Sequence, residues 1–123
     1  MDKVLIVDDD QLINDICEEV LEKANYNVFI AKNGKLATKI LNEEKDIAVV
    51  ITDIIMPEKD GIQFIKELRK NYPGIKIIAM SGGGKINANQ YLDMASKLGA
   101  DMILEKPFDI DHLTESVDKV LDK

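Results

Sequence analysis

The chain has 123 residues, enough for one compact domain with a single hydrophobic core. Its 16 basic and 23 acidic residues give a formal net charge of −7, which argues against binding to nucleic-acid backbones or anionic membrane surfaces. The apolar runs are too short to span a membrane, and the N-terminus lacks a signal-peptide pattern. The single cysteine, Cys17, excludes an intrachain disulfide and fits a reducing environment, so we expect a cytoplasmic protein.

Five short runs of mostly β-branched apolar residues predict strands that are buried on both faces. They cover residues 4–7, 28–31, 47–51, 75–80 and 102–104. Amphipathic helical stripes follow them at residues 12–24, 36–41, 62–68, 91–98 and 110–121. Turn signals at Asn33-Gly34, Pro73-Gly74 and Gly99 separate the elements. This fivefold alternation predicts a single α/β domain in which helices cover both faces of a parallel sheet.

Polar residues follow four of the five predicted strands, at the edge where open parallel sheets bind ligands. They are Asp8, Asp9 and Asp10 after the first run, Asp53 after the third, Ser81, Gly82, Gly83 and Gly84 after the fourth, and Glu105, Lys106 and Pro107 after the fifth. We expect these groups to meet at one edge of the sheet and to form the functional site.

Some of the polar residues have a structural interpretation. Asp10 is suited to cap the first helix, and Asp60 is suited to cap the third. Cys17 lies on a predicted apolar helix face and is expected in the core. His112, the only histidine, stands near the start of the last helix, where an exposed or capping role is expected.

The remaining strand-end residues suit phosphoryl chemistry. Carboxylates clustered as Asp8, Asp9 and Asp53 should raise at least one pKa unless a cation neutralises them, and they suit Mg²⁺. A carboxylate can attack phosphorus if a cation, a second positive charge and hydrogen-bond donors stabilise the incoming oxygens. Lys106 provides the positive charge, and Ser81 with the glycines after it provides a hydroxyl and exposed backbone N–H groups.

Four segments in this order, "VLIVDDD", "TDIIMPEKDG", "IIAMSGG" and "LEKPF", resemble the receiver domains of two-component response regulators of the chemotaxis-regulator type. The match covers essentially the whole chain, residues 1–123, as one receiver domain. The resemblance implies a flavodoxin-like, doubly wound (βα)5 fold whose parallel strands lie in the order 2-1-3-4-5. It also implies that Asp53 is the phosphoacceptor. Asp8, Asp9, Asp53 and the backbone carbonyl of Ile55 would hold Mg²⁺.

The resemblance also assigns the switch. Ser81 would supply the switch hydroxyl, the backbone of Gly82 would contact the phosphoryl group, and Lys106 would pair with the aspartate or its phosphate. The Lys106–Pro107 bond would be cis. Family members often carry Tyr or Phe three residues before the lysine, where this chain has Ile103. The usual coupling of hydroxyl and aromatic ring cannot operate in that form here. We further expect a mobile loop at residues 82–84 and a readout face formed by helix four, strand five and helix five.

The expected partners are a sensor histidine kinase or a histidine phosphotransfer protein, together with an output protein or an effector domain outside these residues. The chain would be a stand-alone regulator or part of a longer protein, and it would catalyse only its own phosphorylation and dephosphorylation. One alternative is a phosphorylation-independent docking module, which Ile103 favours. A second is a haloacid-dehalogenase-like phosphatase, because Asp8 and Asp10 have the required spacing; Leu12 and the short chain argue against it.

Overall fold

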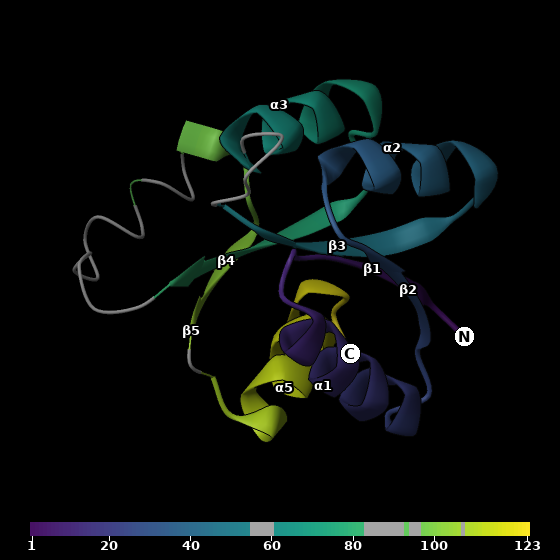
Figure 1. Cartoon of the computed structure of the whole chain (residues 1–123), viewed down its shortest axis with the longest axis vertical. Helices are drawn as coiled ribbons and strands as arrows, with labels where there is room; N and C mark the ends of the chain where they lie inside the picture. Colours follow the sequence, from purple (N-terminus) through teal and green to yellow (C-terminus); the bar gives the residue numbers. More distant parts are fainter. Residues whose placement is uncertain (55–60, 83–92, 94–96, 107) are drawn as a thin grey trace.

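The structure is a computed structural model that describes residues 1–54, 61–82, 93, 97–106 and 108–123. Strands and helices alternate along the chain, as the apolar runs and helical stripes predict (Figure 1). The elements are β1 (Lys3–Val7), α1 (Gln11–Lys23), β2 (Asn27–Ala31), α2 (Gly34–Glu43), β3 (Ile47–Asp53), α3 (Gly61–Asn71), β4 (Lys76–Gly82), β5 (Met102–Lys106) and α5 (Ile110–Val120). The fourth predicted helix, at residues 91–98, lies mostly outside the described residues.

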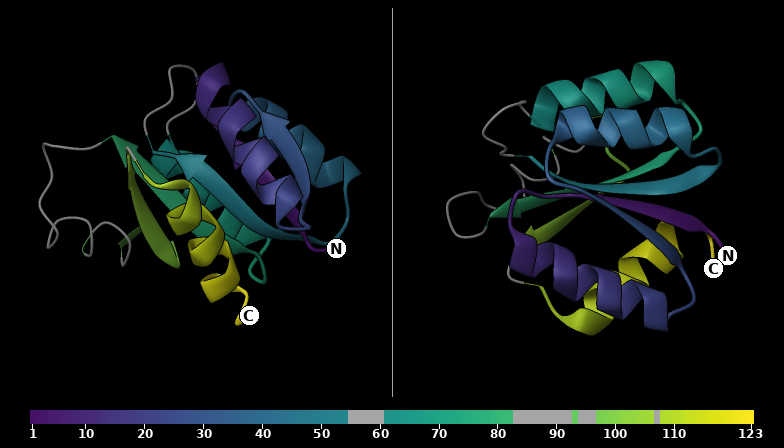
Figure 2. Two further views of the ribbon diagram at one scale, coloured as in Figure 1. Left: turned by 90° about the horizontal axis from the view of Figure 1, so that it is seen from below. Right: turned by 45° about the vertical axis from the view of Figure 1, so that its right-hand side comes forward.

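The five strands form one parallel sheet in the order β2-β1-β3-β4-β5, which confirms the predicted fold. Helices α2 and α3 cover one face of the sheet, and α1 and α5 cover the other (Figures 1 and 2). From β1 the chain adds β2 on one side of the sheet and then β3, β4 and β5 on the other side. The ends of β1 and β3 therefore lie at the topological switch point, where such sheets bind ligands.

The core consists of two layers, one on each face of the sheet. In β1, Leu5 and Val7 join the layer beneath α2 and α3, whereas Val4 and Ile6 join the layer against α1 and α5. All four side chains are fully buried, because successive residues of a strand point to opposite faces. The continuous apolar runs therefore confirm the prediction of strands that are buried on both faces.

Local capping contacts position the first two helices. Asp10 is the N-cap of α1 and accepts a hydrogen bond from the Leu12 backbone N–H at 3.0 Å, as predicted. Asn33 caps α2 in the same way and accepts from the Leu36 N–H at 2.9 Å. The predicted cap at Asp60 lies outside the described residues.

A hydrogen-bonded node fixes the start of β5 against α3. The Arg69 guanidinium donates five hydrogen bonds, which reach the carbonyls of Pro73, Ile75 and Gly99 and the carboxylate of Asp101. The Asp101 carboxylate also accepts from the Ile77 N–H at 2.8 Å. Since β5 begins at Met102, this node sets where the strand carrying Lys106 enters the sheet.

Two of the structural interpretations of single residues are also met. Cys17 lies on the face of α1 that packs against the sheet and is fully buried, as expected of a core residue. His112 is exposed in the first turn of α5. None of the helices in the described part of the chain is both long and apolar enough to cross a membrane.

Candidate functional site

Three carboxylates meet where β1 and β3 end. Val7 pairs with Thr52 in the parallel register, so the residues that follow, Asp8 and Asp53, lie side by side. One carboxylate oxygen from each of Asp8, Asp9 and Asp53 lies within 4.8 Å of the others, close enough to share one cation. Asp8 is fully buried and Asp53 is 8% exposed, whereas Asp9 is exposed. Asp9 is therefore the most accessible member of the group.

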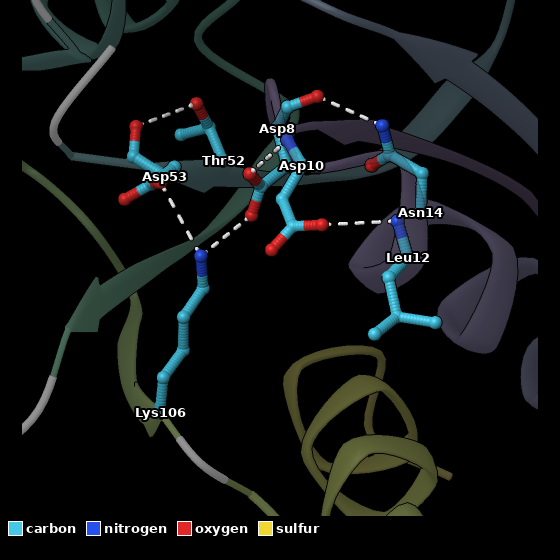
Figure 3. Close-up of polar contacts among 7 residues, drawn as sticks. All are labelled: Asp8, Asp10, Leu12, Asn14, Thr52, Asp53 and Lys106. Carbon is cyan, nitrogen blue, oxygen red and sulfur yellow. Dashed lines mark hydrogen bonds and ion pairs between the residues drawn. The ribbon is translucent and has the colours of Figure 1, made fainter.

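Lys106 reaches this cluster from the end of β5 (Figure 3). Its Nζ atom lies 2.6 Å from Oδ2 of Asp8 and 3.3 Å from Oδ2 of Asp53. Because β4 separates β5 from β3, only a long side chain can bridge this distance. The lysine side chain is 20% exposed, and both of its partners are more buried. It therefore places a positive charge beside two carboxylates in a partly desolvated site.

The pKa values reflect this packing. Burial raises the pKa of Asp8, and the contacts with Lys106 and with the Asp10 N–H only partly offset the effect. Burial alone would lower the pKa of Lys106, but its hydrogen bond to Asp8 and the negative charges of Asp53 and Asp8 raise it overall. Lys106 is therefore a firmly charged ammonium, and the acidic cluster favours an added cation. The residues present fit a hard divalent ion such as Mg²⁺.

Backbone and side-chain contacts hold Asp8 in place. Its N–H donates to the Ala31 carbonyl at 3.1 Å, and its Oδ1 accepts from the Asp10 N–H at 2.9 Å. Its carbonyl accepts from Nδ2 of Asn14 at 2.8 Å. On the β3 side, the hydroxyl of the buried Thr52 donates to the Asp53 carbonyl at 3.1 Å.

Two residues of α1 differ from the predicted stripe. The predicted apolar stripe consists of Leu12, Ile13, Ile16, Cys17, Val20, Leu21 and Ala24. Asn14 lies outside this stripe but is 1% exposed, whereas Leu12 belongs to it but is 66% exposed. Cys17 and Leu21 of the predicted stripe do pack on the sheet, and Asn14 joins them on that face. The spacing of these three residues is the available signal, but a polar residue at the first position obscures it.

The other predicted site residues are described only in part. The backbones of Ser81 and Gly82 pair with Glu105 and Lys106, which places them at the same edge of the sheet as Asp53. The position of the Ser81 side chain lies outside the description. Residues Ile55, Gly83, Gly84 and Pro107 also lie outside the described residues. Ile103 is half-buried and packs against the core layer beneath α2 and α3.

Comparison with known proteins agrees with this fold. The family model of the response regulator receiver domain matches residues 4–118, and the chain belongs to this family. A curated relative, sporulation initiation phosphotransferase F of Bacillus subtilis, is 35% identical over 120 residues, which cover 98% of this chain and 94% of the relative. The transcriptional regulatory protein CpxR of Escherichia coli is 32% identical over 121 residues, and the chain spans only 50% of its length.

Solved structures show the same architecture. A CheY-like receiver domain protein from Methanospirillum hungatei matches with a TM-score of 0.88 at 28% identity, over 99% of this chain and 94% of that one. The chemotaxis protein CheY4 of Vibrio cholerae matches with a TM-score of 0.87 at 28% identity, over 98% of both chains. The expected family and fold are thus confirmed.

Proposed function

We propose that this chain accepts a phosphoryl group from a phosphohistidine on Asp53 and uses the modification to switch the binding of a partner. The observation that carries the proposal is the position of Asp53, next to Asp8 and Asp9 and 3.3 Å from the ammonium of Lys106. A carboxylate in this setting faces a positive charge that can stabilise an incoming phosphoryl group.

Each of the predicted site residues has a role in the proposed reaction. A carboxylate oxygen of Asp53 forms a bond to phosphorus while the bond between phosphorus and the donor imidazole breaks. Asp8, Asp9 and Asp53, with the carbonyl of Ile55, would hold Mg²⁺, which supplies positive charge for the phosphoryl oxygens. Lys106 lies close enough to move from Asp53 onto the new phosphate. Ser81 and the backbone of Gly82 are proposed as further hydrogen-bond donors to it.

The same charge change would drive the switch. An acyl phosphate adds nearly two negative charges and three acceptor oxygens, which attract Lys106 and Ser81. Lys106 ends β5, so its movement would pass to the face formed by helix four, β5 and α5. Ile103 lies on β5 and would transmit the change through apolar packing, without the aromatic ring common in the family.

An apolar groove between α1 and the start of α5 is a candidate docking surface for the phosphodonor. The groove has a volume of about 560 Å³ and lies between α1 and α5, where Ile16, Val20, Phe108 and Ile110 line it. Ile110 is 58% exposed, and Leu12 adds an exposed apolar side chain on the same helix as Ile16. We propose that a sensor histidine kinase or a histidine phosphotransfer protein docks here, because exposed apolar surface is typical of protein-binding sites and α1 begins directly after the turn that carries Asp8 and Asp9.

The test is phosphorylation with a small acyl phosphate in MgCl₂, followed by intact-mass measurement. We expect wild-type protein to gain one phosphoryl group and Asp53→Asn to gain none. Asp15→Asn removes the same charge from the exposed face of α1 and should label like wild type. Full-rate labelling of Asp53→Asn would exclude Asp53 as the acceptor.

The output partner, a cytoplasmic location and any effector domain in the whole protein also remain part of the proposal. We propose that the chain catalyses only its own phosphorylation and dephosphorylation. A pull-down with mock-treated and beryllofluoride-treated protein tests the switch. Capture of a partner only after treatment supports it, whereas equal capture under both conditions favours a phosphorylation-independent docking module.

A further inference from the structure

Asn14 is a buried amide on the face of α1 that packs against the sheet. It is 1% exposed and shares this face with Cys17 and Leu21, which are fully buried. Polar groups at such positions carry a desolvation cost unless hydrogen bonds satisfy them. The contacts of Asn14 therefore decide whether it serves the core or the acidic site.

One end of the amide is satisfied and the other is not. Nδ2 donates to the main-chain carbonyl of Asp8 at 2.8 Å (Figure 3). Oδ1 is buried and has no hydrogen-bond partner among the residues that the structure describes. A half-satisfied amide is a poor stabiliser of the core, because a leucine of similar size would bury no unpaired acceptor.

The satisfied end acts on the turn that presents two of the carboxylates. Asp8 and Asp9 lie between the end of β1 and the N-cap of α1, which is Asp10. At the start of this turn the Asp8 N–H donates a hydrogen bond to the Ala31 carbonyl. The Asp10 N–H donates a second hydrogen bond, to the Asp8 carboxylate. Asn14 holds the Asp8 carbonyl, the point from which the chain continues to Asp9.

We infer that Asn14 is a positioning residue for the cation site, which sets the relative placement of the Asp8 and Asp9 carboxylates through its bond to the Asp8 carbonyl. This inference rests on the proposed function, since it assigns the residue to the Mg²⁺ site of that proposal. The contact is direct, spans six positions of sequence and is fully buried, so water does not compete for it. Residues that orient metal ligands typically change metal affinity by about 10- to 100-fold when they are replaced.

The test measures the Mg²⁺ dissociation constant and stability on the same variants. MgCl₂ is titrated at constant ionic strength and followed by amide chemical shifts, and stability is followed by urea unfolding in EDTA. For Asn14→Leu we expect about tenfold weaker Mg²⁺ binding. We also expect a urea midpoint equal to or above that of wild type, because the unpaired acceptor is removed.

Two further variants separate positioning from packing and from charge. Ser116→Ala changes another buried polar residue of the layer against α1 and α5, whose hydroxyl donates to the His112 carbonyl, and it should leave Mg²⁺ affinity unchanged. Asn14→Asp keeps the size and adds a negative charge but loses the donor. We expect it to bind Mg²⁺ more weakly than wild type.

Each outcome decides between the alternatives. Equal Mg²⁺ affinity in wild type and Asn14→Leu, or tighter binding by Asn14→Asp, overturns the inference and leaves the proposed function intact. A lower urea midpoint with unchanged affinity also overturns it, because Asn14 would then serve the fold alone. Absence of Mg²⁺ binding by the wild-type chain overturns both the inference and the proposed cation site.

Discussion

The ammonium of Lys106 lies 2.6 Å from the carboxylate of Asp8, although the two residues are 98 positions apart in the sequence. The fully buried Asp8 has no other cationic partner among the described residues, and two further carboxylates lie within reach of the same site. The pair is therefore the main neutralising contact of an acidic cluster in this structure.

Replacing Lys106 by methionine should destabilise the protein by about 2 kcal/mol in EDTA, because a buried carboxylate loses its counter-charge. MgCl₂ should reduce this deficit, since a cation binds the more negative site of the variant more tightly. Urea unfolding with and without Mg²⁺ measures both effects. Lys23→Met, which breaks the exposed pair with Glu19, should cost less than about 0.5 kcal/mol. A Lys106→Met variant as stable as wild type in EDTA would contradict the prediction.

The raised pKa of Asp8 predicts an inverse pH dependence for its contribution to stability. The folded state holds the Asp8 proton more tightly than the unfolded chain, whose value is near 3.8. Stability from this residue is therefore fully present below pH 3.8 and is lost as the pH rises through the folded pKa.

Asp8→Asn should therefore be more stable than wild type at neutral pH in EDTA, and the difference should shrink as the pH approaches 3.8. Urea unfolding across the pH range measures it. Asp15→Asn controls for net charge. If the stability advantage of the Asp8→Asn variant instead grew on acidification, the folded pKa of Asp8 would be lowered and the prediction would be wrong.

Arg69→Lys should destabilise the protein by about 2 kcal/mol, because an ammonium cannot replace the planar fork that reaches three carbonyls and Asp101. The side chain is 32% exposed, so the ion pair itself contributes little and the carbonyl contacts account for most of the loss. Urea unfolding gives the magnitude, and hydrogen exchange at the Ile77 and Asp101 amides should accelerate. The neighbouring Lys70→Gln should change neither quantity. Unchanged hydrogen exchange in Arg69→Lys would contradict the prediction that the Arg69 hydrogen bonds hold the start of β5.

Cys17 should resist thiol reagents in the folded protein. Burial, with a smaller effect from the Asp8 charge, raises the pKa of its thiol to about 11, so at pH 8 about one thiol in a thousand is ionised. We expect slow labelling in buffer and fast labelling in urea, measured by thiol-reagent absorbance. Rapid labelling of the native protein would show that α1 opens from the sheet more readily than its fully buried face implies.

Much of the fold could be read from local patterns. Uninterrupted apolar runs such as that ending at Val7 can be buried only between two layers, and helical stripes supply those layers. Parallel strands then bring their carboxyl ends to one edge. The acids at positions 8, 9 and 53 were therefore predictable as neighbours from the sequence.

The finer arrangement depended on tertiary packing. No local signal pairs Lys106 more closely with Asp8 than with Asp53, because that choice depends on the reach of a long side chain across β4. For a similar reason, Asn14 is buried and Leu12 is exposed, the reverse of what the apolar stripe predicts. The turn after β1 sets the rotation of α1 on the sheet, and that rotation buries the amide and exposes the leucine. The sequence by itself determined which chemical groups reach the site, and only the tertiary structure decided which atoms meet there.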